Sequence, residues 1–271
     1  KYGTLDYVYL EENFHELPFL EGDELRRTPL DFLSKPLTDV SRVYFSSGTM
    51  GAPKIMFYSQ EDFRRDVELA ARFSRFEGVR GEDRVLVVLP MSLWAVGPIT
   101  AQAHREVGAK VATVDSSTSF DVLEEVISSF EPTVISSTPS VLLEYAHMKR
   151  APEVRIIETT GEPLTSKARR MLEEEYGGEV YDAYGMAECI VGVECPEHKG
   201  YHYWPDTALL ETVQTEHGLE LIITNLNREL MPIVRYRSGD LAELEDSCGC
   251  GVPLPKVKLT GRAKLTIHLY S

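Results

Sequence analysis

A glycine-spaced polar loop is the clearest candidate for chemistry in this 271-residue sequence. The segment 46–54, SSGTMGAPK, lies between VYF at 43–45 and IMFY at 55–58, two runs that predict strands. Gly48 and Gly51 allow positive φ angles that bring backbone N–H groups close to an anion. An ordinary turn is the alternative, because the spacing is not that of a Walker loop. The hydroxyl and ammonium donors that complete a phosphate site are Ser46, Ser47, Thr49 and Lys54.

Three more polar segments follow predicted strands. The segment 159–164, TTGEPL, suits the edge of a heterocycle, although a simple turn explains it equally well. In YDAYGMAE at 181–188, Tyr184 suits stacking on a base and Glu188 suits Mg²⁺, which prefers oxygen ligands. Asp240 follows a predicted turn in RYRSGDL, where a carboxylate suits the two hydroxyls of a ribose.

A scaffold must bring these segments together, and the pattern between them predicts one. Short apolar runs alternate with amphipathic helical segments, starting with RVLVVLP at 84–90. Such βαβ alternation predicts a parallel sheet covered by helices, with ligands beyond the carboxyl ends of its strands. The expected helices are 63–76, 98–108, 120–130, 140–149 and 165–176, and the expected strands are 84–90, 110–114, 133–136, 154–158 and 179–184.

After Ala187, glycine, proline and short alternating runs predict a smaller antiparallel β subdomain. Its expected strands are 219–225, 233–236, 241–244 and 256–260. The expected fold class is therefore α/β, with a parallel βαβ core and an antiparallel β subdomain. The expected units are an N-terminal segment, an α/β nucleotide-binding core, a β-rich subdomain and the start of a hinge, at 1–40, 41–187, 188–262 and 263–271.

Composition limits the classes of function. The chain is 43% hydrophobic and 26% charged, which is typical of a globular protein. The formal net charge of -15 argues against a nucleic-acid or anionic-membrane partner, because both need basic surfaces. No apolar run approaches the ~20 residues that span a bilayer. Four cysteines are too few for a disulfide framework, so the cytoplasm is the expected compartment.

The ordered motifs SSGTMGAPK, TTGEPL, YGMAE, YRSGDL and GR resemble those of the AMP-forming adenylate ligases, which include acyl-CoA synthetases and adenylation domains. Within this superfamily the chain is most similar to phenylacetate–CoA ligases and coenzyme F390 synthetase-like proteins, from about Leu17 to Arg262. The resemblance implies that ATP activates an organic acid, aromatic or apolar, as an acyl-adenylate that passes to CoA or another acceptor. The alternatives are a module that binds ATP or AMP and adenylates weakly or not at all, and a scaffold without nucleotide.

The resemblance also implies roles for matching residues. Tyr184 is the adenine-stacking aromatic, Asp240 the ribose anchor, and Arg262 a second ribose or phosphate contact. The residues assigned to catalysis are Thr49, Lys54 and Glu188, the last holding magnesium. The full nucleotide-binding set is Ser46, Ser47, Gly48, Thr49, Gly51, Lys54, Gly161, Glu162, Pro163, Asp182, Ala183, Tyr184, Gly185, Met186, Glu188, Asp240 and Arg262. The expected partners are a small carboxylic acid, ATP, CoA or another acceptor, and a second copy in a homodimer.

The sequence departs from the family pattern in three places. Met50 and Ala187 stand where the family has hydroxyl residues near the phosphates. A lost charge-assisted hydrogen bond is worth roughly 1.5–3 kcal/mol, which slows adenylation by up to roughly a hundredfold. The chain also ends at Ser271, soon after Lys264 at the family's hinge position, so the mobile C-terminal lid is expected to be missing through trimming or truncation.

Cysteines and histidines suggest a zinc site. Their spacing is not that of a zinc finger, so unconnected reduced cysteines and surface histidines are the alternative. The resemblance favours zinc, since several phenylacetate–CoA ligase-like proteins carry a structural zinc at matching positions. The expected ligands are Cys195, His202, Cys248 and Cys250, with His198 in reserve and a stapling role in the β subdomain.

The acid is expected to bind among mostly apolar side chains beside the adenylate. Trp94, Val96, residues 137–139, Ala183 and Met186 are the candidates for its pocket. His104 lies at a helical position among apolar residues and is expected to be a satisfied core histidine.

Overall fold

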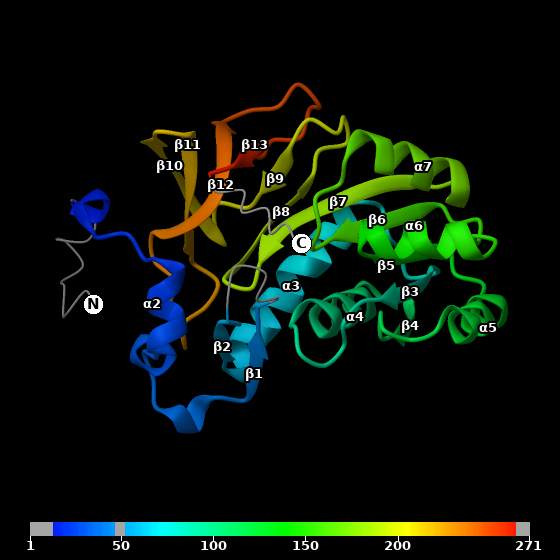
Figure 1. Cartoon of the computed structure of the whole chain (residues 1–271), viewed down its shortest axis with the longest axis horizontal. Helices are drawn as coiled ribbons and strands as arrows, with labels where there is room; N and C mark the ends of the chain where they lie inside the picture. The colour runs from blue at the N-terminus through cyan, green and yellow to red at the C-terminus, as the bar shows by residue number, and fades with distance from the viewer. Residues whose placement is uncertain (1–12, 47–51, 264–271) are drawn as a thin grey trace, which may run out of the picture.

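The computed structural model describes residues 13–46 and 52–263, and a sheet of eleven strands runs through it (Figure 1). The strand order is β10-β11-β12-β13-β9-β8-β7-β6-β5-β3-β4, and β1 and β2 form a separate hairpin. The strands are β1 (Arg42–Phe45), β2 (Ile55–Tyr58), β3 (Arg84–Val88), β4 (Lys110–Val114), β5 (Val134–Ser137), β6 (Ile156–Thr160), β7 (Glu179–Met186), β8 (Cys189–Glu194), β9 (Tyr201–Tyr203), β10 (Ala208–Thr215), β11 (Gly218–Asn225), β12 (Tyr236–Glu245) and β13 (Lys256–Arg262). The helices are α2 (Gly22–Arg27), α3 (Gln60–Phe76), α4 (Val96–Val107), α5 (Phe120–Phe130), α6 (Pro139–Met148) and α7 (Ser166–Tyr176). Within the described ranges, none of these helices is both long and apolar enough to cross a membrane.

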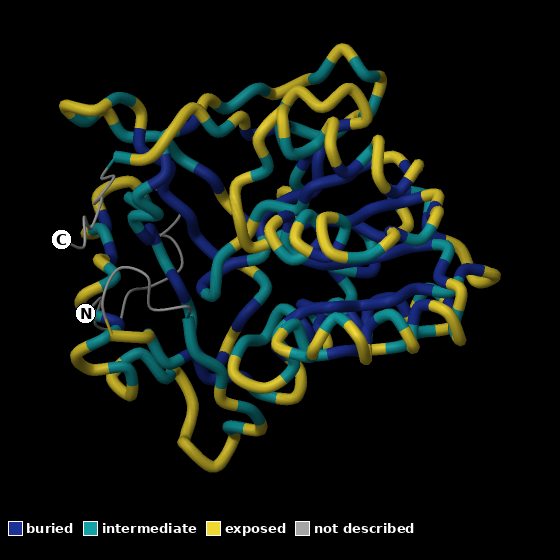
Figure 2. Tube along the Cα trace, turned by 45° about the vertical axis from the view of Figure 1, so that its right-hand side comes forward, coloured by how far each residue is buried: buried dark blue, intermediate teal, exposed yellow. Residues whose placement is uncertain are grey.

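The strands β4, β3, β5, β6 and β7 are parallel, as the sequence predicts, and β3, β5 and β6 in the middle of this part of the sheet are buried on both faces. Leu86 and Val88 of β3 pack with α5, α6 and α7, whereas Val85 and Val87 point to the opposite face and pack with α4. Figure 2 shows these strands as a buried layer between helices whose outer sides are exposed. The expected α/β class with a parallel βαβ core is confirmed.

The remaining strands are antiparallel and continue the same sheet, because β8 pairs with β7. The predicted strands at 219–225, 241–244 and 256–260 lie within β11, β12 and β13. The predicted strand at 233–236 is wrong, since the backbone is irregular until β12 begins at Tyr236. Strands β8, β9 and β10 are not predicted by the sequence. The division of the chain into four segments stays a prediction.

The turn predicted before Asp240 is also wrong. Gly239 has a φ of 76° but lies inside β12, where the pairing shifts register on both sides. A left-handed glycine inside a strand produces a local bulge and not a reversal of the chain. Asp240 therefore belongs to a sheet strand and is held by its neighbours on both sides.

The β1–β2 hairpin is fixed to the core by α3, which begins at a capping box. Ser59 accepts a hydrogen bond from the Asp62 N–H, and Asp62 accepts one from the Ser59 N–H. The Asp62 carboxylate also accepts from the backbone N–H groups of Glu229 and Leu230. One side chain thus caps the helix and fixes the chain before β12. This arrangement positions Lys54, which directly precedes β2.

The N-terminal segment docks beside β12. Leu20 donates its N–H to the Arg235 carbonyl over 2.9 Å and accepts the Arg237 N–H over 3.0 Å. Helix α2 follows, and a 3-10 turn begins at Pro29. The docking brings α2 close to Lys54, since the position of a Cβ at Gly22 lies 3.9 Å from Lys54 Nζ.

Candidate active site

A cavity of about 890 Å³ lies at the carboxyl ends of the parallel strands, and we call it the central cavity. Its walls come from the β1–β2 hairpin, from α2, α3 and α4, from the ends of β5 to β7, and from β12. Ligands of open α/β sheets bind at this edge. The predicted residues on its wall are Ser46, Lys54, Gly161, Glu162, Ala183, Tyr184, Gly185, Met186, Glu188 and Arg262. Pro163, Asp182 and Asp240 lie off the wall, and Ser47, Gly48, Thr49, Met50, Gly51 and Lys264 fall outside the described residues.

Lys54 and Glu188 form a buried ion pair on the cavity wall. The side chain of Glu188 is 2% exposed and that of Lys54 is 11% exposed. Lys54 Nζ also donates to the Tyr236 hydroxyl over 2.9 Å. Glu188 Oε1 contacts Nζ, but no donor in the described part of the chain is aligned to give it a hydrogen bond. The site thus holds a carboxylate oxygen that can accept a further ligand.

Tyr184, Asp240 and Arg262 meet on the strands β7, β12 and β13. The Tyr184 hydroxyl donates to Asp240 Oδ2 over 2.7 Å, and Arg262 Nε donates to Asp240 Oδ1 over 2.8 Å. Burial, together with the Asp240 charge, raises the pKa of Tyr184 well above its ordinary value. Its hydroxyl is therefore neutral and remains a donor. Asp240 is 5% exposed, and these two donors cover its carboxylate.

The turn that carries Glu188 is anchored from below. Asn225 Nδ2 donates to the Glu188 carbonyl over 2.8 Å, and Arg228 Nη1 donates to the Ala187 carbonyl over 2.8 Å. Arg228 is itself buried in an ion pair with Asp66 of α3, at 2.7 Å, and lies over the Tyr58 ring. The predicted magnesium ligand is thus fixed to the sheet and to α3.

Two of the predicted nucleotide-binding residues, Asp182 and Glu162, also make hydrogen bonds that stabilise the fold. Asp182 accepts from the hydroxyls of Thr159, at 2.5 Å, and Tyr201, at 2.7 Å, and its burial raises its pKa to about 7. Glu162 accepts from the backbone N–H and hydroxyl of Ser140, at 3.1 and 2.8 Å, and so ties the TTGEPL segment to the first turn of α6. Asp182 faces the sheet interior, whereas Glu162 faces the cavity.

Sequence reasoning missed three residues that shape the site. Tyr236 and Arg26 line the cavity next to Lys54, and Arg26 Nε donates to the Ala52 carbonyl over 3.1 Å. Arg228 supports the turn from within the core. Arg26 lies in the DELRR run at 23–27, but nothing in its spacing links it to a loop 26 residues later. Only docking of the N-terminal segment reveals the link.

The predicted acid pocket is partly assembled. Trp94, Val96, Ala183 and Met186 line the central cavity, as does Thr138 of the segment 137–139. The Trp94 ring nitrogen is buried and has no hydrogen-bond partner among the residues that the structure describes. His104 is fully buried, as expected, and its Nε2 pairs with Glu158 Oε2 at 2.9 Å. Its Nδ1 has no hydrogen-bond partner in that part of the chain.

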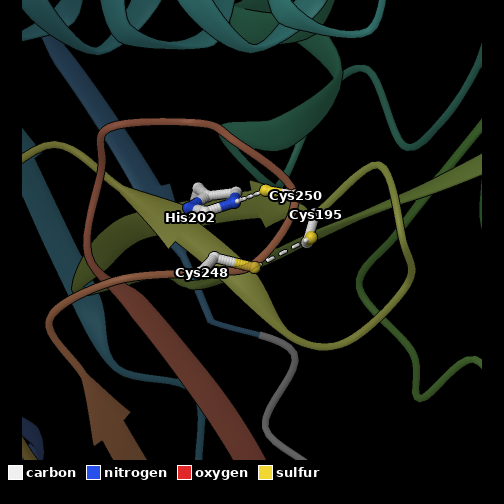
Figure 3. A group of neighbouring side chains, drawn as sticks. All are labelled: Cys195, His202, Cys248 and Cys250. Atoms are coloured by element: carbon white, nitrogen blue, oxygen red, sulfur yellow. Dashed lines mark hydrogen bonds between the residues drawn. The ribbon is translucent and has the colours of Figure 1, made fainter.

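A second site lies outside the cavity, where Cys195, His202, Cys248 and Cys250 converge (Figure 3). Their ligand atoms all lie within 4.8 Å of one another. Cys195 Sγ is 3.4 Å from Cys248 Sγ, and His202 Nε2 is 3.2 Å from Cys250 Sγ. Ligands around a tetrahedral zinc with Zn–S bonds of about 2.3 Å are separated by about 3.8 Å. The donor set and its spacing therefore fit zinc.

The surroundings of His202 favour a metal ligand. Its Nδ1 lies 3.2 Å from the Leu254 carbonyl, which holds the proton on that nitrogen and leaves Nε2 free to bind. His198, the reserve ligand, instead contacts Glu194 at 3.2 Å. Phe76 packs against both His202 and Trp204, with ring centroids 5.9 and 6.1 Å apart.

Comparisons with known proteins find a family model and several relatives. The family model described as AMP-binding enzyme matches residues 8–215. The phenylacetate-coenzyme A ligase of Pseudomonas putida is 30% identical over 93% of this chain and 62% of its own length. The phenylacetate-coenzyme A ligase of Thermus thermophilus is 31% identical over 89% of this chain and 58% of its own. The chain thus spans about three-fifths of these relatives.

Solved structures share the fold. An open conformation of a 2-hydroxyisobutyryl-CoA ligase, in complex with 2-HIB-AMP and CoA, superposes with a TM-score of 0.82 at 22% identity. The match covers 93% of this chain and 61% of that one. ATP-bound MatB from Rhodopseudomonas palustris superposes with a TM-score of 0.64 at 16% identity, over 86% of this chain and 50% of that one.

Proposed function

The chain belongs to the AMP-binding enzyme family, and from that premise we propose that it activates a carboxylic acid with ATP in the central cavity. The acid's carboxylate oxygen attacks the α-phosphorus, the bond to the bridging oxygen breaks, and pyrophosphate leaves. A thiol, that of CoA in our proposal, then loses its proton and attacks the acyl carbon, and AMP leaves. The observation that carries the proposal is that Lys54, Glu188, Tyr184 and Arg262, from three distant segments, line one cavity.

In this proposal, the described side chains of the cavity contact different parts of ATP. Lys54 supplies positive charge toward the phosphates, and Ser46 lies beside it, with its hydroxyl accepting the Lys54 N–H at 2.9 Å. Tyr184 offers its ring to adenine, and Asp240 and Arg262 are placed behind it for the ribose. Catalysis of this kind depends on positioning and on neutralising charge that develops in the transition state.

We assign Mg²⁺ to Glu188 and a structural Zn²⁺ to the four-residue cysteine and histidine cluster. The buried, unaligned Oε1 of Glu188 is a hard oxygen ligand of the kind that Mg²⁺ prefers. Bound there, Mg²⁺ would neutralise phosphate charge. Zinc would link the chain after β8 to the loop before β13, far from the reacting atoms. Since ATP and CoA are cytoplasmic metabolites, we place the reaction in the cytoplasm.

Release of pyrophosphate with ATP, Mg²⁺ and a panel of carboxylic acids tests the proposal. We expect release that depends on both acid and Mg²⁺, and a matching thioester when CoA is added. Binding of ATP without acid-dependent release would show a nucleotide-binding module in place of a ligase. A protein that ATP and AMP fail to stabilise against heat would contradict both, because a ligand that binds only the native state raises its stability.

A further inference from the structure

One end of the central cavity has apolar walls and a polar floor. Helix α3 contributes Ala70, Phe73 and Ser74, and its C-cap residue Glu77 continues the same face, because these positions are spaced three and four residues apart. Helix α4 contributes Val96, Ile99, Thr100 and Ala103 in the same way. Most of these side chains are apolar or small. At the floor, Glu77 meets two more cavity-lining residues, Ser136 of β5 and Glu158 of β6.

The floor residues are buried and short of donors. Glu77 and Glu158 are each 7% exposed and Ser136 is 2% exposed. Glu158 Oε2 pairs with His104 Nε2 at 2.9 Å, behind the cavity wall. Glu158 Oε1 has no aligned donor among the described residues, and the neighbouring groups that carry a proton are Glu77 and Ser136. Buried carboxyl oxygens without donors are costly, and each one needs a partner.

The charges of the floor are fixed by its surroundings. Burial, reinforced by the neighbouring Glu158, raises the pKa of Glu77 well above its ordinary value. Burial also opposes ionisation of Glu158, but the adjacent His104 outweighs it and holds the Glu158 pKa below its ordinary value. At neutral pH the floor therefore holds one carboxylic acid and one paired carboxylate. Glu158 Oε1 is the floor oxygen that no donor in the described part of the chain is aligned to satisfy.

We propose that this floor, formed by Glu77, Ser136 and Glu158, recognises a hydrogen-bond donor at the far end of the acid, a hydroxyl or an amino group. The inference rests on the proposed function, since it assigns the acyl part of the substrate to this end of the cavity. It narrows the expected aromatic or apolar acid to one with an apolar body and a polar tip. A second carboxylate at the tip is excluded, because it would meet the Glu158 charge.

This preference has an energetic reason: a buried hydrogen bond that is formed stabilises modestly, whereas a buried polar group left unpaired is costly. A tail that ends in hydrocarbon would cover the floor and leave its oxygens unpaired, whereas a donor completes them. Sites built to bond a substrate hydroxyl reject the analogue that lacks it far more strongly than apolar pockets reject an extra group. Selectivity should therefore exceed the roughly tenfold effect of one neutral hydrogen bond.

Binding of stable acyl-adenylate mimics tests this selectivity without requiring turnover. The probes are acyl-sulfamoyl adenosines that carry phenylacetyl, 4-hydroxyphenylacetyl, 3-hydroxyphenylacetyl, 4-aminophenylacetyl or 4-carboxyphenylacetyl groups, with affinity measured by calorimetry. We expect at least one hydroxyl or amino probe to bind more than about tenfold tighter than the phenylacetyl probe. The carboxyl probe should bind weakest.

Two substitutions at Glu77 separate the floor's chemistry from its shape. Glu77→Gln preserves the outline and one carbonyl oxygen, and its N–H groups replace the O–H donor of the protonated acid, so the preference for the donor-bearing probe should remain. Glu77→Met removes the polar atoms, and the preference should fall to within about threefold or reverse in favour of the phenylacetyl probe. Glu125→Met, an exposed change on α5, is the matched control and should leave all affinities unchanged.

The outcomes separate the inference from the function on which it rests. Equal binding of the phenylacetyl and donor-bearing probes by the unaltered protein would overturn the inference while supporting the ligase. Tighter binding of the carboxyl probe would do the same. If neither AMP nor any probe binds, the proposed function fails first. Should Glu77→Met not fold, the order of probe affinities for the unaltered protein decides the matter.

Discussion

Lys54 and Glu188 illustrate how single residues depend on each other in this cavity. Each is the other's charged partner, and both are buried, so neither can be removed without leaving the other charge unpaired. Phosphates and Mg²⁺ together would provide each of them with a new partner. In the free protein Lys54 and Glu188 therefore neutralise each other, and substrate binding would replace this contact with contacts to phosphate and Mg²⁺.

Glu188→Gln should lower pyrophosphate release by about a hundredfold to a thousandfold, the cost of removing one group that stabilises transition-state charge. The amide keeps the size of the side chain but has no charge for Mg²⁺. The measurement is the initial rate as a function of Mg²⁺ concentration. An exposed change on α7, Glu174→Gln, is the control. An unaltered Mg²⁺ dependence in Glu188→Gln would contradict the assignment.

The candidate site could be predicted from the sequence only where residue type and spacing both indicate chemistry. Tyr184 and Glu188 stand four residues apart in one motif, and the structure places both on the cavity wall. Glu77 and Glu158 carry no such signal, because they lie 81 positions apart and look like ordinary helix and strand residues. Only packing of α3 against the sheet brings them together.

At the scale of elements, the two ends of the parallel strands differ in purpose. The carboxyl ends form the cavity, whereas the amino ends are fastened by Asp83. Its carboxylate accepts from the Arg80 N–H at 2.7 Å, from the Thr133 hydroxyl at 2.8 Å and from Arg155 Nε at 2.9 Å. These contacts join the starts of β3, β5 and β6.

Asp83→Asn should destabilise the protein by about 2 kcal/mol at neutral pH. Burial disfavours the Asp83 charge, but Arg155 and the other donors outweigh it and lower its pKa from 3.8 to about 2. Because the pKa is lower in the folded state, the contribution is complete above about pH 5 and is lost as pH falls through the folded value. Urea unfolding at several pH values should show the two proteins converging toward acid pH. A constant difference would contradict this account.

The Asp66–Arg228 pair links α3 to the turn that carries Glu188. Both side chains are 1% exposed, so Arg228→Met should destabilise the protein by about 3–5 kcal/mol through the unpaired Asp66 charge. Asp66→Asn alone should also be costly. The double variant should lose less free energy of unfolding than the two single variants lose together. Urea unfolding of the unaltered protein, both single variants and the double variant would measure this coupling as a double-mutant cycle. Strict additivity would contradict coupling.

The elements that the sequence predicts best are those with the strongest periodicity. The helices α3 to α7 combine apolar faces with capping residues such as Ser59 and Gly108, and the parallel strands are short apolar runs. Strand β9 has only three residues, and β8 contains Gly192, whose missing side chain allows His202 to approach. Short strands of this kind are defined by their neighbours in the sheet, which the sequence pattern does not show.

At the scale of the whole molecule, one sheet joins the cavity to the cysteine and histidine cluster. Strands β7 and β12 reach the cavity, and β9 and β13 lie between them in the strand order. Strand β9 carries His202 of the cluster, and Cys248 and Cys250 lie in the loop before β13. Zinc there would stabilise the antiparallel half of the sheet without touching a substrate.

Removal of the metal should lower thermal stability far more than it lowers catalysis. We expect one zinc per chain by elemental analysis, and none in Cys248→Ser/Cys250→Ser. A chelator should lower the melting temperature of the unaltered protein, and added zinc should restore it, because binding to the native state stabilises it. Cys189→Ser changes a buried cysteine outside the cluster and should retain zinc. A protein that is purified without zinc and gains no stability from it would contradict the site.

The two tryptophans stand at these two sites. Trp94 lines the central cavity, whereas Trp204 stacks on Phe73 at 5.3 Å beside the ring of Phe76 that touches His202. Emission spectra of Trp204→Phe would therefore follow occupation of the nucleotide and acid site through Trp94 alone. Trp94→Phe would isolate the signal from the metal side. The fold thus contains two fluorescent reporters, and quenching of tryptophan fluorescence in the two variants measures the solvent accessibility of each half of the sheet separately.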